Sequence, residues 1–267
     1  MSGGVLNCWV RGVGLLGPGL SDWATGRELL AEPSRWVSAP TVVPAPSRLP
    51  PAERRRAGGI VKVGIAVADQ ACAQAGLDPR DVATVFSAST GDGANCHALC
   101  ETLATPQRAV SPTRFTNSVH NAPAGYWHIA TASRAPSTSL CAHDASFGAG
   151  LLEAASQCLC GQQPVLLVAS DVPYPQPLQA TRPLLDAMGV ALLLDTVPGD
   201  APLLRLRIEP GDAAPEGCGH AGLEALRRGI PAARALPLLQ RMARGLAQPC
   251  VLEVLDGLSL AVTVEPA

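Results

Sequence analysis

SPTRFTNSVHNAPAGYWHIATASRAPSTSLCAHDASFGAGLL is the stretch from Ser111 to Leu152, and its second half predicts a strand, a sharp turn and a helix. The strand is expected at Thr138–Leu140, because these residues follow Pro136 and favour extended backbone. The helix is expected over Ala145–Leu152, a small and apolar run without proline. Asp144, directly before it, is a residue type typical of a helix N-cap.

Two glycines indicate where this helix lies. Gly148 and Gly150 each cost a solvated helix about 1 kcal/mol relative to alanine. They are better explained by a place where another backbone comes close. We therefore expect the helix to lie deep in a core, with its N-terminus facing a pocket.

Strands and helices alternate along the rest of the chain. Strands are predicted at residues 5–16, 82–89, 164–170, 189–194 and 203–209, and helices at 21–30, 53–76, 97–103 and 220–246. Ser21 is the expected cap of the first helix, and Gly76 the end of the second. Asp256-Gly257 predicts a hairpin between strands 251–255 and 258–264. This alternation favours an α/β layered fold with a mixed sheet.

Composition limits the classes of function. The chain has 267 residues, 47% apolar and 16% charged, enough for one large domain or two small ones, and we expect a single domain over 1–267. A net charge of −2 gives no basic footprint for nucleic acid or an anionic membrane. No apolar run has the length of a membrane span. The nine cysteines are scattered and odd in number, which favours reduced thiols and a cytoplasmic protein.

The central stretch resembles the active-site segment of the β-ketoacyl synthases, the condensing enzymes of fatty acid and polyketide synthesis. Those proteins carry N-x-x-(A/S)-G and, further on, G-P-S-x-x-x-x-T-A-C-S-S. Asn121–Gly125 (NAPAG) matches the first pattern, and Ala135–Ser137 matches G-P-S with alanine for glycine. Counting on without a gap, the nucleophilic cysteine of the family falls on Asp144, and a later serine is kept as Ser146. A carboxylate cannot form the acyl thioester.

The resemblance covers residues 4 to 210. AQAGLDPRDV at 73–82 and SASTGDG at 87–93 fit the family's helix and the strand that follows it, and Arg182-Pro183 with Asp186 resembles its R-P-F-D. It implies one thiolase-type half, a layered αβα fold with a five-stranded mixed sheet. The second thiolase half, which supplies two catalytic histidines in the family, is lacking. We interpret Gly219-His220 as a coincidental echo of one histidine motif.

Two cofactor or metal readings are disfavoured by the sequence. The glycines of GVGLLG lead into Pro18 and not directly into a helix, unlike a dinucleotide fingerprint. Cys96 and Cys100, with His97, lack a second pair of zinc ligands. We expect neither a cofactor nor a metal.

Asp144 and its neighbours allow two interpretations each. Asp144 is either a carboxylate in the old nucleophile pocket that accepts backbone N–H bonds, or an ordinary N-cap, and we favour the cap. Cys141 and His143 suggest an activated thiolate before a helix N-terminus, but side chains two residues apart on an extended turn point apart. We favour a buried structural cysteine.

The segment before NAPAG carries further candidates. In the family it crosses the dimer interface, so the resemblance implies that it lines the partner's acyl tunnel, with Phe115 as gate or floor. The alternative is that Phe115 lies in the chain's own core. The aromatic pair Tyr126 and Trp127 suits either an interface or the core. The tunnel-lining candidates are Phe115, Asn117, Ser118 and His120.

These features predict a non-catalytic subunit. It would pair with a full-length β-ketoacyl synthase as a chain-length factor does, and resembles the short ketoacyl-synthase-like proteins of aryl polyene clusters. Substrate would arrive on an acyl carrier protein docked mainly to the active partner. The sheet would extend across a two-fold-like interface through Ser137, Thr138, Ser139, Leu140 and Cys141. The alternatives are a stand-alone acyltransferase or thioester hydrolase using Cys141 or Asp144, and a homodimeric acyl-binding protein.

Overall fold

A single eight-stranded sheet forms the centre of the protein. The computed structural model describes residues 4–200 and 203–266. The sheet order is β3-β2-β4-β5-β1-β6-β8-β7. The strands are β1 Leu6–Leu16, β2 Ala83–Ser87, β3 Ser137–Leu140, β4 Val165–Asp171, β5 Met188–Asp195, β6 Leu204–Gly211, β7 Cys250–Leu255 and β8 Leu258–Pro266.

The prediction of a five-stranded sheet is wrong in number, although the mixed α/β class is confirmed. Strands β3, β2 and β4 run parallel, and β5 and β1 follow them antiparallel. Three more strands continue the same sheet, because β6 pairs with the first half of β1 at residues 6–10. The predicted hairpin around Asp256-Gly257 supplies the last two, and it is confirmed with Gly257 at a φ of 74°.

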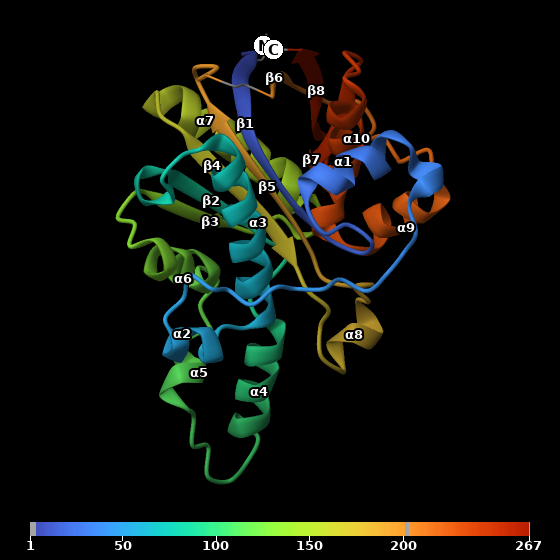
Figure 1. Ribbon diagram of the computed structural model, residues 1–267. Coiled ribbons are helices and arrows are strands. Elements are labelled where there is room, and N and C mark those ends of the chain that lie inside the picture. The colour runs from blue at the N-terminus through green and yellow to red at the C-terminus, as the bar shows by residue number, and fades with distance from the viewer. Residues whose placement is uncertain (1–3, 201–202, 267) are drawn as a thin grey trace.

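Helices cover both faces of the sheet (Figure 1). They are α1 Trp23–Ala31, α2 Pro51–Arg56, α3 Gly59–Ala75, α4 Gly93–Leu103, α5 Pro112–Thr116, α6 Ala122–Thr131, α7 Ser146–Gly161, α8 Leu178–Thr181, α9 Ala221–Gly229 and α10 Leu236–Arg244. Helices α3 and α6 enclose one buried cluster with Leu166 and Val168 of β4. Helix α7, with α1 and α10, encloses the other with Val165 and Leu167. Neighbouring residues of β4 thus serve opposite faces, which explains its continuous apolar sequence.

The glycines of β1 serve helix packing. A Cβ on Gly12 would lie 2.0 Å from the carbonyl oxygen of Ala71, and one on Gly14 would lie 1.9 Å from that of Val67. Helix α3 therefore crosses β1 in direct backbone contact. Gln70 of α3 also accepts a hydrogen bond from the backbone N–H of Leu15 at 2.9 Å. The glycine-rich run is therefore a packing surface for α3.

Several predicted helix boundaries are wrong. Asp22, not Ser21, caps α1, because its carboxylate accepts from the N–H of Thr25 at 2.8 Å. The helix expected over 53–76 is broken between α2 and α3 by extended backbone at Ala57 and Gly58. The helix expected over 220–246 is divided at Ile230 into α9, the 3-10 turn Pro231–Ala235 (η4) and α10. The end of α3 at Gly76, in left-handed conformation, is confirmed.

Two arrangements set the position of the site. Helices α4 and α5 and the loop that joins them extend away from the sheet at the lower end of the view (Figure 1). Strand β3 lies at one end of the sheet order, and the turn that follows it leads into α7. Residues 4–200 and 203–266 include no helix that is long and apolar enough to cross a lipid bilayer.

Candidate functional site

The site begins in the turn between β3 and α7. His143–Ala145 form a single 3-10 turn (η3), with His143 in left-handed conformation at a φ of 52°. The hydroxyl of Ser146 accepts from the N–H of Ala142 at 3.0 Å and donates to the carbonyl of His143 at 2.7 Å. This serine, the one that matches the family motif, therefore fixes the turn. Helix α7 begins at Ser146 without a side-chain cap, so the prediction that Asp144 caps it is wrong.

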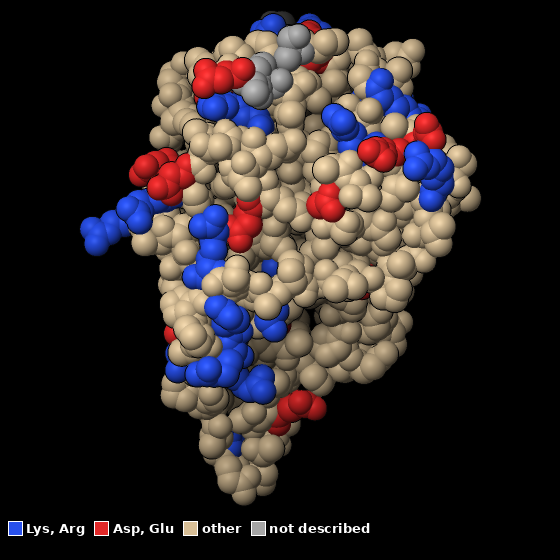
Figure 2. Space-filling model, viewed as in Figure 1, with Lys and Arg blue, Asp and Glu red and all other residues tan. Residues whose placement is uncertain are grey.

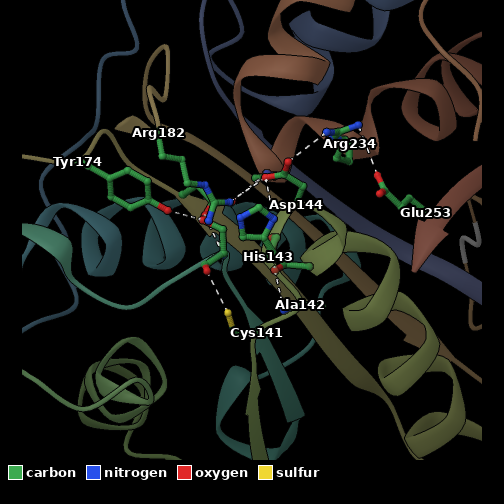
Figure 3. Close-up of polar contacts among 12 residues, drawn as sticks. Cys141, Ala142, His143, Asp144, Tyr174, Arg182, Arg234 and Glu253 are labelled. Carbon is green, nitrogen blue, oxygen red and sulfur yellow. Dashed lines mark hydrogen bonds and ion pairs between the residues drawn. The ribbon is translucent and has the colours of Figure 1, made fainter. Parts of the chain in front are cut away.

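Asp144 is instead the centre of an ion cluster (Figure 3). Arg182 Nη2 lies 2.8 Å from its Oδ1, and Arg234 Nη2 lies 3.5 Å from its Oδ2. Arg234 also reaches Glu253 Oε2 of β7 at 3.5 Å. The carboxylate side chain remains 39% exposed. Asp144 thus joins the turn after β3 to the segment before β5 and to η4.

A hollow of about 350 Å³ opens beside this cluster. His143, Asp144, Arg182 and Arg228 are its titratable lining residues. Arg228 is already bonded to Glu224, with Nε 2.6 Å from Oε1. The sequence predicted a pocket at the N-terminus of α7, and a hollow is present there. Asp144, Arg182 and Arg228 in its lining thus already form ion pairs within the protein.

Cys141 and His143 are not brought together. The thiol of Cys141 donates to the backbone carbonyl of Ser89 at 3.0 Å, whereas His143 Nδ1 lies 3.7 Å from Asp144 Oδ1. Cys141 is exposed, so the prediction of a buried structural cysteine is wrong. The turn does point the two side chains apart, as expected.

The sequence reasoning missed a buried carboxylate next to the cluster. Asp171 ends β4 and is 2% exposed; its Oδ1 accepts from the N–H and hydroxyl of Ser89, at 2.9 and 2.5 Å, and its Oδ2 from the N–H of Ala232 at 2.8 Å. Burial raises the pKa of Asp171 despite these hydrogen bonds. Burial also raises the pKa of Tyr174, whose hydroxyl lies 3.0 Å from that of Ser89. The one local signal was an aspartate closing the apolar run VLLVASD.

The tunnel-lining candidates lie on α5 and along the segment that leads from α5 to α6. Phe115 is 69% exposed on α5, so its placement in the chain's own core is wrong. Asn117 accepts from the hydroxyl of Tyr126 at 3.1 Å, and the hydroxyl of Ser118 donates to the carbonyl of Phe115 at 2.7 Å. His120 lies on a narrow hollow with Ser87 and Ser170 at the ends of β2 and β4, and no described group bonds its buried Nε2.

The aromatic pair of α6 belongs to the core. Tyr126 and Trp127 are buried in the cluster beneath α3. The opposite face of α6 is exposed, with Ile129 51% accessible. The interface interpretation therefore does not apply to this pair, whereas Ile129, which the sequence analysis did not single out, is available to a partner.

The charges of the surface are unevenly placed. Arginine side chains gather over the lower left of the face in Figure 2, where Figure 1 shows α2 and α5. Helix α2 contributes Arg54, Arg55 and Arg56, and α5 contributes Arg114. The net charge of −2 gave no hint of this local basic surface.

The cysteines of α4 do not form a metal centre. His97 Nε2 lies 3.3 Å from Glu101 Oε1, one turn further along the helix. Across the part of the chain that the structure describes, no group of three or more His, Cys, Asp or Glu side chains is arranged to hold a metal ion.

Comparisons with known proteins agree with this architecture. The chain is similar, with a TM-score of 0.74 and 22% identity, to a chain in the complex of the ketosynthase ApeO with its chain length factor ApeC from Xenorhabdus doucetiae, covering 97% of this chain and 99% of that one. The ishigamide ketosynthase/chain length factor gives a TM-score of 0.70 at 12% identity, with 98% and 99% coverage.

A third similar structure contains a carrier protein. It is the complex AntDE:AntF, a type II polyketide synthase acyl-carrier protein with its ketosynthase bound to the hexaketide, with a TM-score of 0.72 at 12% identity and full coverage of both chains. These likenesses establish a shared fold. Among curated protein sequences, none matches the chain.

The family itself is established by sequence. The profile described as beta-ketoacyl synthase, N-terminal domain, matches residues 27–228, which is well over half of the chain. This span includes the Asn121–Gly125 motif, the strand β3 and the turn that carries Asp144. The chain therefore belongs to the β-ketoacyl synthase family, and the part that matches is the N-terminal domain of that family.

Proposed function

We propose that this protein is a non-catalytic ketoacyl-synthase-like subunit that pairs with a full-length β-ketoacyl synthase and helps to shape its acyl tunnel, as a chain length factor does. The pathway in which it acts is of the polyketide or fatty acid type, and we propose that its product is an aryl polyene. The acyl group arrives on an acyl carrier protein that docks mainly to the active partner.

The observation that carries this proposal is the ion-paired Asp144. Condensation through an acyl-enzyme needs a thiolate at this position, because the acyl group is held as a thioester before it is transferred. A carboxylate bonded to Arg182 and flanked by Arg234 offers no such nucleophile. The site has therefore become a structural junction, and the chemistry belongs to the partner.

The exposed residues around α5 and α6 support a role at an interface. Phe115 and Val119 are at least half exposed, and Ile129 projects from the accessible face of α6. Exposed apolar side chains such as these are available for burial in a subunit interface. In the proposed pair, Phe115 reaches the partner's tunnel and limits how far the acyl chain extends.

Co-expression tests the proposal directly. This chain, carrying the sole affinity tag, is produced with the full-length ketoacyl synthase encoded nearest to it. The expected result is a stable one-to-one complex in which acyl labelling is confined to the partner's cysteine. Recovery of this chain alone as a folded protein that itself acquires an acyl group at Cys141 would show that it is a stand-alone enzyme.

A further inference from the structure

Two exposed cysteines lie side by side on α4. Cys96 and Cys100 are four positions apart, which places them one turn from each other on the same side of the helix. The pKa of the Cys96 thiol is raised, first by desolvation and then by the Cys100 thiol beside it. The other exposed cysteines, Cys141 and Cys160, lie in different parts of the fold and serve as single thiols for comparison.

Helix α4 has few anchors, and one of them holds α5. Figure 1 shows both helices extending away from the sheet. Of the 11 residues of α4, all of which the structure describes, Asn95 and Leu99 are buried. Asn95 Nδ2 donates to the carbonyl of Arg114 at 2.8 Å, and its own N–H donates to the capping carboxylate of Asp92 at 3.0 Å. None of the five residues of α5 is buried, so the start of α4 positions α5.

A disulfide between Cys96 and Cys100 does not fit an intact helix. Residues four positions apart in an α-helix have their Cβ atoms about 5–6 Å apart. A disulfide needs a Cβ separation of about 3.5–4.5 Å. The backbone between the two cysteines must therefore move when the bond forms. An exposed helix with few buried contacts is a segment that opens at low free energy, so the pair can close at the expense of this part of α4.

We infer that Cys96 and Cys100 are a redox-sensitive pair, which a small-molecule disulfide oxidises to an intrahelical disulfide, and that this bond opens the start of α4 and releases α5. One cysteine thiolate attacks the small disulfide, and a small thiolate leaves. The second cysteine thiolate attacks the mixed disulfide, and the other small thiolate leaves. The two protein thiols are oxidised, the small disulfide is reduced to two thiols, and these take up the two protons that the cysteines lose.

The release of α5 affects Phe115. This residue directly follows Arg114, whose carbonyl Asn95 holds, and it is the side chain proposed to reach the partner's tunnel. The effect on the tunnel rests on the proposed function, whereas formation of the disulfide does not. In the oxidised subunit the position of Phe115 is less well fixed, so the length of the product is less narrowly defined.

Oxidised glutathione, added to the purified full chain, tests whether the bond forms. The remaining thiols are then alkylated, and mass spectrometry of the digested protein gives the state of each cysteine. We expect a peptide in which Cys96 and Cys100 have together lost two hydrogens, whereas Cys141 and Cys160 carry glutathione. Free thiols or separate glutathione adducts at Cys96 and Cys100, without a link between them, would overturn the inference.

Hydrogen exchange measures the release of α5. On oxidation, we expect exchange to rise several-fold over residues 93–103 and 112–116, to stay unchanged in α10, and to recover when dithiothreitol is added. The paired change Cys96→Ser and Cys100→Ser should abolish this response, and Cys160→Ser should leave it intact. Asn95→Ala should raise exchange in α5 without any oxidant. A linked pair with unchanged exchange in α5 would show that the disulfide forms without releasing it.

Product length tests the consequence for the complex. A chain with Cys141→Ser and Cys160→Ser is oxidised, freed of glutathione and only then mixed with the ketosynthase, so that the partner's cysteine is never exposed to the oxidant. We expect a broader distribution of product lengths than with the same chain kept reduced, and no difference once Cys96→Ser and Cys100→Ser are added. Equal distributions would overturn the link to Phe115. Failure to form any complex would instead contradict the proposed function, and the two measurements on the separate chain would still decide the disulfide.

Discussion

Arg182 Nη2 donates to Asp144 Oδ1 at 2.8 Å, and this bond ties the turn after β3 to the segment before β5. Arg182 also stacks over the ring of Tyr174, with 5.8 Å between Cζ and the ring centroid. The same carboxylate faces Arg234 of η4, while the backbone of η4 is held by Asp171 through the N–H of Ala232. Two aspartates, one half-exposed and one buried, thus fasten the C-terminal part of the chain to the turn after β3.

Asp144→Asn tests whether this residue is structural. We expect the free energy of unfolding to fall by about 1 kcal/mol, because the partly exposed carboxylate loses its charge while Arg182 and Arg234 remain. Urea denaturation of the isolated chain measures this. Elongation by the complex should keep its rate and product profile, since the proposed function places the chemistry in the partner.

A matched control is Glu265→Gln, which removes the charge of another partly exposed residue, 3.5 Å from Arg205 at the edge of the pairing between β6 and β8. The pair is isolated, so the expected loss is below about 0.5 kcal/mol. An Asp144→Asn complex that stays assembled but no longer elongates would place Asp144 in the reaction and contradict the proposal.

Phe115 is the residue whose size should set product length. We expect Phe115→Ala to lengthen and Phe115→Trp to shorten the acyl chains made by the complex, as measured by mass spectrometry of the products. Because the ring is 69% exposed in this chain, neither change should alter unfolding of the isolated subunit by more than about 0.5 kcal/mol. Val37→Ala, at a residue 75% exposed on another surface, should leave the products unchanged. Identical products from both Phe115 variants would end the tunnel hypothesis.

Asp171 should make stability fall as pH rises. Burial holds its pKa above the usual value of 3.8, so the folded state retains a proton that the unfolded chain has released. The associated stability is present below about pH 4 and is lost as the pH rises through the raised pKa. Asp171→Asn should lower the free energy of unfolding by about 1–3 kcal/mol at low pH, because the NH2 group of the new side chain would face a backbone N–H donor. The difference in free energy of unfolding between this variant and the unsubstituted protein should become smaller toward neutral pH. Urea denaturation at a series of pH values measures that difference.

Asp22 supplies a control of opposite sign. Its pKa is lowered, chiefly by the hydrogen bond from the N–H of Thr25, so its stabilising effect is present above the unfolded pKa and is lost as the pH falls through the lowered value. Asp22→Ala should cost about 0.5–2 kcal/mol at neutral pH, as loss of an N-cap does, and less in acid. If the two variants lose stability with the same dependence on pH, at least one of the two assignments is refuted.

Gly14→Ala should destabilise the fold strongly. Its Cβ would lie 1.9 Å from the backbone oxygen of Val67, and a backbone atom cannot rotate away as a side chain can. We expect a loss of at least about 1–3 kcal/mol, the usual cost of overpacking, in thermal or urea unfolding. Gly211→Ala, where nothing lies within 4 Å of the added carbon, should change stability by less than about 0.5 kcal/mol. Equal effects at the two positions would show that α3 does not pack on β1 as described.

Local signals explain what the sequence could predict. The apolar run at 165–171, the Asp256-Gly257 turn and the glycine end of α3 each depend on neighbours within a few residues, and each was predicted with small boundary errors. The eight-stranded order was missed, because it depends on β6 meeting β1 some two hundred positions away.

The same reasoning applies to the site. Aspartate is a residue type that favours helix caps, so the local sequence predicts a cap at Asp144. Its ion pairs are with Arg182 and Arg234, which lie 38 and 90 positions away in the sequence. Asp171 was overlooked for the same reason, since Ser89 and Ala232 lie 82 and 61 positions from it. The sequence left Phe115 with two alternatives, a partner's tunnel or the chain's own core, because an aromatic residue on a short helix carries no sign of which side faces solvent.

The central place of β1 has a consequence for synthesis of the chain. β1 is made first, yet its neighbours are β5 at residues 188–195 and β6 at residues 204–211. Both edges of β1 therefore stay unpaired during synthesis until most of the polypeptide has emerged from the ribosome. Such long-range pairing slows folding and exposes the nascent strand to aggregation. A truncation before residue 188 would remove both neighbours of β1, so we expect it to prevent assembly of the whole sheet rather than shorten it.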